Sequence, residues 1–77
     1  MTNITDTLDY LIKAIVTDAS SIVINSHQVG EVLILEVSAA PEIIGQIIGK
    51  EGKIIKSIRT ILNLSFPSVQ YSLEIKD

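Results

Sequence analysis

Residues 47–58 read IIGKEGKIIKSI, and this stretch decides how the rest of the chain is arranged. It places Gly49 and Gly52 three residues apart, around a lysine and a glutamate, between two isoleucine-rich segments. Glycine adopts backbone conformations that end one helix and start another, so the pattern predicts a tight turn between two helices. Glycine also leaves the backbone bare, so that another molecule can approach it. The glycines therefore serve either a turn between core helices or a contact with a ligand.

The periodicity of apolar residues on both sides of this turn predicts the other elements. One helix opens at the segment 40–42 and stops at Gly49, and a second begins after Gly52 and ends before Pro67, which cannot continue it. We expect Ile58, Ile61 and Leu62 of this second helix to be core residues. The remaining expected elements are a helix over 4–16, an antiparallel strand pair over 21–27 and 31–38, and a strand over 68–75 with Val69, Tyr71, Leu73 and Ile75 on one face.

The resulting element order, α-β-β-α-α-β, predicts an α+β fold in which three helices pack on one face of a three-stranded sheet. The chain has 77 residues, of which 47% are hydrophobic and 19% charged. This length and composition predict a single folded domain over residues 1–77 rather than two domains or a disordered segment.

Several protein classes are excluded by what the sequence lacks. No apolar run reaches the roughly 18 residues of a membrane span, and the first residues lack the basic start of a signal peptide. Cysteine is absent, so disulfides and thiolate metal sites are excluded. We therefore expect a cytoplasmic protein that does not enter a membrane.

The charge of the chain is unevenly distributed. Its net charge is −3, yet four of its six basic residues fall within ten positions, with only Glu51 opposing them. These four residues, which we call the basic strip, are Lys50, Lys53, Lys56 and Arg59. The window carries a net charge of +3, which leaves −6 for the rest of the chain. A basic strip on an acidic body favours an anionic partner at that one place.

Nucleotide-binding and catalytic motifs are missing from the sequence. The spacing from Gly45 to Lys50 is one residue too short for a P-loop, and Glu51 stands where the required Ser or Thr should be. A dinucleotide fingerprint is excluded because Gly45 and Gly49 lie four residues apart. His27, the one histidine, stands in an expected hairpin turn without a ligand-type neighbour. We therefore expect no enzyme activity, no cofactor and no metal site.

The spacing Ile48-Gly49-x-x-Gly52-x-x-Ile55-x-x-Ile58 resembles the signature of KH domains, I-G-x-x-G-x-x-I-x-x-I. The element order is similar to that of the type II, or prokaryotic, KH fold. The segment 40–62, APEIIGQIIGKEGKIIKSIRTIL, and the chain length resemble the KhpA family of small bacterial RNA-binding proteins with a single KH domain. This resemblance covers essentially the whole chain. It implies binding of single-stranded RNA, in the role of an RNA chaperone or post-transcriptional regulator.

The resemblance also implies which residues would hold the RNA. In KH domains the G-x-x-G loop clamps the backbone of about four nucleotides, while the bases lie in a largely aliphatic groove. Carried over to this chain, the expected RNA-binding residues are Gly45, Ile48, Gly49, Lys50, Glu51, Gly52, Lys53, Ile55, Lys56 and Arg59. Glu51 departs from the pattern, because its carboxylate repels phosphate within the clamp. Relatives self-associate or pair, which implies a homodimer or a heterodimer with a larger KH-containing RNA-binding protein.

Two other functions compete with RNA binding. The KH scaffold could serve as a protein-interaction or dimerisation module with little RNA affinity, since a small isoleucine-rich domain can expose an apolar patch to a partner. Helix-turn-helix DNA binding is disfavoured, because Ile54, Ile55 and Ile58 are apolar where a recognition helix needs polar side chains to read bases.

Overall fold

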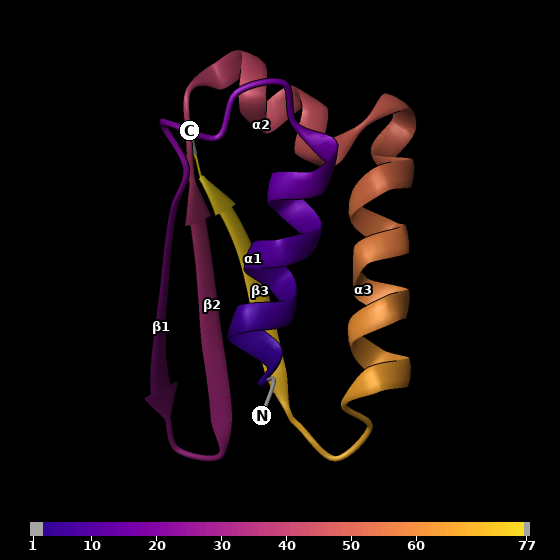
Figure 1. Ribbon diagram of the computed structural model, residues 1–77. Coiled ribbons are helices and arrows are strands. Elements are labelled where there is room, and N and C mark those ends of the chain that lie inside the picture. The colour runs from indigo at the N-terminus through magenta and orange to yellow at the C-terminus, as the bar shows by residue number, and fades with distance from the viewer. Residues whose placement is uncertain (1–2, 77) are drawn as a thin grey trace.

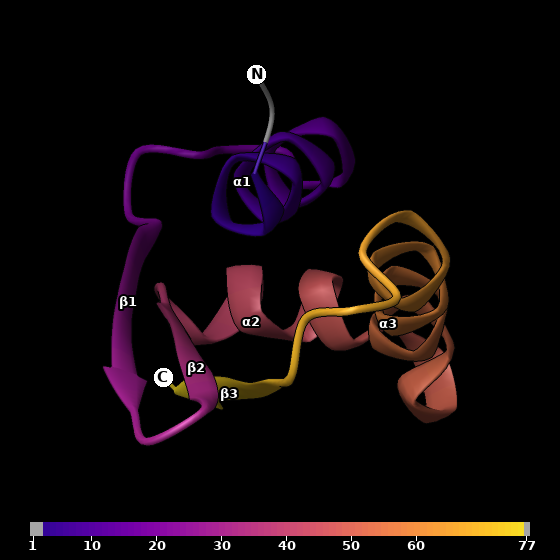
Figure 2. The same cartoon turned by 90° about the horizontal axis from the view of Figure 1, so that it is seen from below.

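The computed structural model describes residues 3–76 and has two layers, a three-stranded sheet and three helices on one of its faces (Figure 1 and Figure 2). Its elements are α1 (Ile4–Ile15), β1 (Val23–Val29), β2 (Val32–Ser38), α2 (Pro41–Ile48), a 3-10 turn η1 (Lys50–Gly52), α3 (Lys53–Ser65) and β3 (Tyr71–Lys76). This order confirms the predicted α-β-β-α-α-β architecture.

The sheet has the strand order β1-β2-β3, with β1 antiparallel and β3 parallel to β2. Because β2 and β3 are parallel, the chain must return to the starting end of the sheet between them, and α2 and α3 make this crossover (Figure 1). Alternate side chains of the strands, including Leu35, Val37 and Leu73, are buried against the helices. Both β1 and β3 are left as edge strands.

The core between the two layers is aliphatic. Its fully buried side chains, each with 0% exposure, are Leu8, Ile12, Leu35, Val37, Ile47 and Leu62. Burial of such branched side chains supplies the main stabilisation of a domain this small. On α3, Ile55 and Ile58 are also buried, whereas Ile61 is 40% exposed, so the prediction of Ile61 as a core residue is wrong. Ile61 lies about 60° further round the helix than Ile58, at the margin of the buried stripe.

The β-hairpin has a shorter turn than the sequence predicted, and its first strand is shifted by two residues along the chain. β1 runs to Val29 instead of ending at His27, because its last residues still pair with β2. The turn is therefore at Gly30, whose φ of 60° favours glycine. His27 lies within the strand, with its Nδ1 atom 3.6 Å from Oε1 of Glu36, so the prediction of an isolated histidine in the turn is wrong.

The helices are short, and the longest of them, α3, has 13 residues. No helix within residues 3–76 is long and apolar enough to cross a membrane. The same residues contain no group of three or more His, Cys, Asp or Glu side chains that could hold a metal ion.

Leu62 and Leu64 provide a matched test of the core. We expect Leu62→Ala to lower the free energy of unfolding by about 2–5 kcal/mol, because it removes a fully buried side chain. Leu64 is 78% exposed, so Leu64→Ala is expected to change that free energy by less than about 0.5 kcal/mol. Urea unfolding of both variants, followed by circular dichroism at low protein concentration, measures the difference. Similar losses in the two variants would contradict this assignment of the core.

Candidate nucleic-acid interface

The turn between α2 and α3 consists of residues 49–52, which we call the GKEG loop. Gly49 ends α2 with φ 76° and ψ 176°, and its N–H donates to the carbonyl oxygen of Gly45 at 2.9 Å. Glu51 and Gly52 follow with φ values of 58° and 72°. The predicted glycine cap at Gly49 thus has positive φ, but its ψ is extended rather than left-handed helical. Positive φ strains any residue other than glycine, so Glu51 is held in a strained conformation.

The two loop glycines are needed for different reasons. A Cβ atom at Gly49 would collide with the side chain and the backbone nitrogen of Ile54 in α3. At Gly52 a Cβ atom would meet only Cγ2 of Ile55, at an ordinary contact distance of 4.0 Å. Gly49 is therefore required by the packing of α3 on the loop, whereas only the positive φ restricts Gly52.

A third glycine, Gly45, exposes bare backbone in the middle of α2. Glycine in a helix interior costs roughly 0.5–1 kcal/mol relative to alanine. A Cβ atom at Gly45 would meet nothing within 4 Å, so the fold itself does not require glycine there. Ile48, 37% exposed, lies one helical turn further on, while Ile55 is buried and shapes this surface only from beneath.

Hydrogen bonds from the end of α1 hold α2 in place next to Gly45. The backbone N–H of Thr17 donates to Oε1 of Gln46 at 2.9 Å, and Nε2 of Gln46 donates back to Oγ1 of Thr17 at 3.1 Å. These two bonds join residues 29 positions apart in the sequence. They restrict the position of the helix that leads into the GKEG loop.

All four residues of the basic strip are exposed, and no salt bridge within residues 3–76 involves any of them. Their charges are therefore available to an anion. Because Lys53, Lys56 and Arg59 lie three residues apart on α3, this part of the strip winds round the helix by about 60° per step. The strip runs from Lys50 in the loop to Arg59, which lies beside β3.

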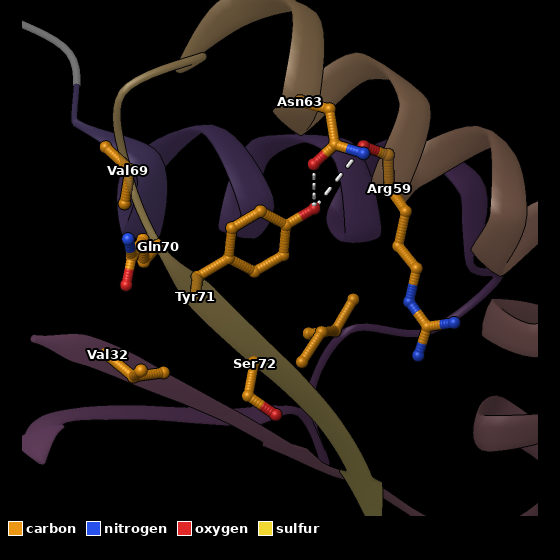
Figure 3. A pocket seen from close by; sticks show the side chains of 8 residues that line it. Val32, Arg59, Asn63, Val69, Gln70, Tyr71 and Ser72 are labelled. Carbon is orange, nitrogen blue, oxygen red and sulfur yellow. Dashed lines mark hydrogen bonds between the residues drawn. The ribbon is translucent and has the colours of Figure 1, made fainter.

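Arg59 borders an open hollow of about 530 Å³ between α3 and β3, which we call the β3 hollow (Figure 3). Its lining residues are Val32, Arg59, Asn63, Val69, Gln70, Tyr71, Ser72 and Leu73. The Tyr71 hydroxyl donates to Oδ1 of Asn63 at 2.8 Å, with the carbonyl oxygen of Arg59 a more distant acceptor at 3.4 Å. Burial raises the pKa of Tyr71, so its hydroxyl remains a donor at neutral pH.

The backbone of β3 alternates between bonding to β2 and facing its free edge. The carbonyl oxygen of Gln70 accepts from the N–H of Leu33 at 2.9 Å, and Leu33 is the partner of Tyr71 in the register. In a parallel ladder this register turns the N–H and C=O groups of Tyr71 and Leu73 away from β2. Both residues line the β3 hollow, so unpaired donors and acceptors of the strand edge lie beside it.

The sequence pointed to the GKEG loop and the basic strip but not to the β3 hollow. Asn63 was not among the expected site residues, because nothing in its neighbourhood distinguishes it from other polar residues of an exposed helix face. The one signal was the alternation that placed Tyr71 on the apolar face of its strand. That pattern predicts burial of the ring, but it does not say which residue meets its hydroxyl.

A model of the KhpA/KhpB KH domain matches residues 5–75, a range that contains the GKEG loop, α3 and almost all of β3. The chain belongs to this family. The KH resemblance drawn from the sequence is thereby confirmed.

Individual KhpA relatives align with nearly the full chain. The RNA-binding protein KhpA of Chlamydia caviae is 42% identical over 74 residues, which cover 94% of this chain and 95% of the relative. The RNA-binding protein KhpA of Chlamydia pneumoniae is 43% identical over 72 residues, covering 91% and 92% of the two chains. The RNA-binding protein KhpA of Treponema pallidum is 33% identical over 70 residues, 88% of each chain. No solved structure matches the chain significantly.

Alanine substitutions at the two loop glycines test their different roles. We expect Gly52→Ala to lower the free energy of unfolding by about 1–2 kcal/mol through its positive φ alone. Gly49→Ala is expected to cost roughly 1–3 kcal/mol more, because its Cβ also collides with Ile54. Urea unfolding of the two variants measures the difference. If Gly49→Ala were the milder of the two, the packing of Ile54 over the loop would be disproved.

Proposed function

We propose that this member of the KhpA/KhpB family binds single-stranded RNA through the GKEG loop and the surface that runs from it along α3 to the β3 hollow. The observation that carries the proposal is the continuity of this surface. It begins with bare backbone at the loop, continues with exposed cations that have no salt-bridge partner in the described chain, and ends at a hollow beside an unpaired strand edge. Its KhpA relatives carry the name RNA-binding protein.

The RNA backbone would be held where α3 begins. No side chain caps this end of the helix, and the N–H of Lys53 already donates to the carbonyl oxygen of Lys50. A phosphate would therefore meet the later N–H groups of the first turn of α3. Lys50 and Lys53 bring positive charge to the same place, and the missing side chain of Gly52 lets a phosphate come close. The carboxylate of Glu51 opposes binding, although its exposure to water weakens the repulsion.

The bases would lie on the aliphatic surface at Gly45 and Ile48 and reach towards the β3 hollow. An aromatic stacking platform is not formed near the loop. Tyr10, which is 73% exposed, lies on α1, and the ring of Tyr71 is partly buried between β3 and α3. Contact with the bases would therefore depend on aliphatic packing and on hydrogen bonds at the edge of β3, rather than on stacking.

Such a site suits weak, reversible binding. A total of about three to four phosphate contacts gives a slope of roughly −2 to −3 for log affinity against log salt concentration with single strands. The net charge of −3 discourages RNA from binding elsewhere on the chain. We therefore propose that the protein acts in the cytoplasm as an RNA chaperone or post-transcriptional regulator.

We also propose that two such domains act together, because joining two weak sites raises the overall affinity without new contacts. The side of α3 opposite Arg59 carries the exposed apolar residues Ile54, Ile61 and Leu64, at 38%, 40% and 78% exposure. This flank would pair two copies, or one copy and a larger KH-containing RNA-binding protein.

Sedimentation of the wild type at a protein concentration of tens of micromolar should show a dimer that Leu64→Asp weakens. A wild type that stays monomeric would exclude the homodimer.

Lys50→Glu tests the RNA-binding role of the loop. We expect it to weaken binding of a short labelled single-stranded RNA by about tenfold or more, because it removes a phosphate contact and adds repulsion. Lys13→Glu is the matched control, with the same change of charge on α1, where Lys13 lies 3.0 Å from Asp9. We expect less than about a twofold effect from the control.

Fluorescence anisotropy at two salt concentrations measures both variants, after circular dichroism has shown that they fold. A salt-sensitive wild type with a selective loss in Lys50→Glu supports the clamp. Equal losses in the two variants would show that only the net charge matters, and would contradict binding at the GKEG loop.

A further inference from the structure

Strand β1 is an edge of the sheet that lacks the usual protection against pairing with another strand. All seven of its residues, Val23–Val29, pair with β2 in an unbroken register without a bulge. The segment reads VINSHQV and contains no proline, lysine, arginine, aspartate or glutamate. Natural edge strands are usually kept from pairing by charges, prolines, bulges or short length, and β1 has none of these.

The other edge of the sheet, β3, differs from β1. It carries the charged residues Glu74 and Lys76, and the Lys76 ammonium donates to Oε2 of Glu36 on β2. Figure 2 shows all three helices on one side of β1, so that no helix covers its outer edge. The N–H and C=O groups that β1 directs away from β2 are therefore open to another strand.

The side chains of β1 are complementary to those of a second β1 strand that runs antiparallel to it. If Ser26 lies on the twofold axis, Val23 opposes the second copy's Val29, and Asn25 opposes the second copy's His27. The two members of each pair are an even number of positions apart, so both project from the same face of the sheet. Val23 and Val29 are 51% and 57% exposed, and this register brings these apolar side chains together without opposing like charges.

We propose that β1 is a docking surface for the β1 strand of a second copy of this chain, with Ser26 on the twofold axis. The two sheets then form one continuous sheet with the strand order β3-β2-β1-β1-β2-β3. Such a twofold pair is closed, because it uses the free β1 edge of both copies and leaves the charged β3 edges at the two ends.

This surface is separate from the apolar flank of α3. Figure 2 shows β1 and α3 at opposite sides of the molecule, so one copy can use both surfaces at once. Pairing through β1 also leaves the GKEG loop and the basic strip uncovered. The proposal does not depend on RNA binding, but a β1 pair that does bind RNA would present two such sites.

The experiment uses cysteine cross-linking, since the chain has no cysteine of its own. Val23→Cys and Val29→Cys are made in the Leu64→Asp background, which disables the apolar flank of α3. Directly opposite residues have Cβ atoms about 4.5–5.5 Å apart, whereas two copies of the same variant would hold their thiols roughly 20 Å apart. With a short bifunctional thiol reagent, we expect a mixture of the two variants to form at least fivefold more covalent dimer than either variant alone.

Ser26→Lys in the same background gives an independent measurement, because it places two like charges directly opposite each other on the axis. We expect it to weaken the dimer observed by sedimentation at least fivefold. Ser68→Lys is the matched control, with the same change in the exposed loop between α3 and β3, and it should leave the dimer unchanged.

Equal cross-linking in the mixture and in the single variants would overturn this register. Absence of cross-linking in the mixture, or a dimer that resists Ser26→Lys, would overturn pairing through β1. All of the substituted residues are exposed, and circular dichroism shows whether each variant keeps its fold.

Discussion

The contact of Ile54 with Gly49 is the constraint on which the rest of the structure depends. The side chain at the start of α3 occupies the space that a Cβ atom of residue 49 would need, so no larger residue fits there. This contact fixes how α3 leaves the GKEG loop and how close it stays to α2. The direction of α3 in turn sets the width of the gap towards β3, where Tyr71 bridges to Asn63. The packing of Ile54 at the loop thus also affects the shape of the β3 hollow, towards the other end of α3.

Helix α3 combines three roles on three sides. Its buried stripe, Ile55, Ile58 and Leu62, attaches it to the core. One flank carries Arg59 and Asn63 and faces β3, while the opposite flank exposes Ile54, Ile61 and Leu64. A single amphipathic helix has only two such sides, core and solvent. The solvent side of α3 is divided into a polar and an apolar flank. RNA binding and pairing of domains would therefore use different surfaces of the same helix.

The sequence predicted the element order and the turn, because each depends on local signals such as the glycine spacing and Pro67. It failed where the outcome depends on how elements dock. Ile61 matched the helical period, but the core accepts only a narrow stripe of α3, and the helices α1 and α2 that pack against α3 set the margin of that stripe. The first strand was predicted two residues too early in the chain, because pairing with β2, rather than local propensity, sets its bounds at Val23 and Val29. The β3 hollow was not predicted because it also depends on how elements dock, since it forms only where α3 and β3 meet.

The glycines differ in whether they are needed for the turn or are left available for contact with a ligand. Gly49 serves the fold, whereas Gly45 is exposed in a helix interior where an alanine would fit. Paired measurements of stability and RNA affinity for Gly45→Ala test whether this surface is kept bare for RNA. We expect the free energy of unfolding to be unchanged or up to about 1 kcal/mol higher, together with a severalfold loss of affinity for single-stranded RNA. An equally stable or more stable variant with undiminished RNA affinity would contradict this expectation.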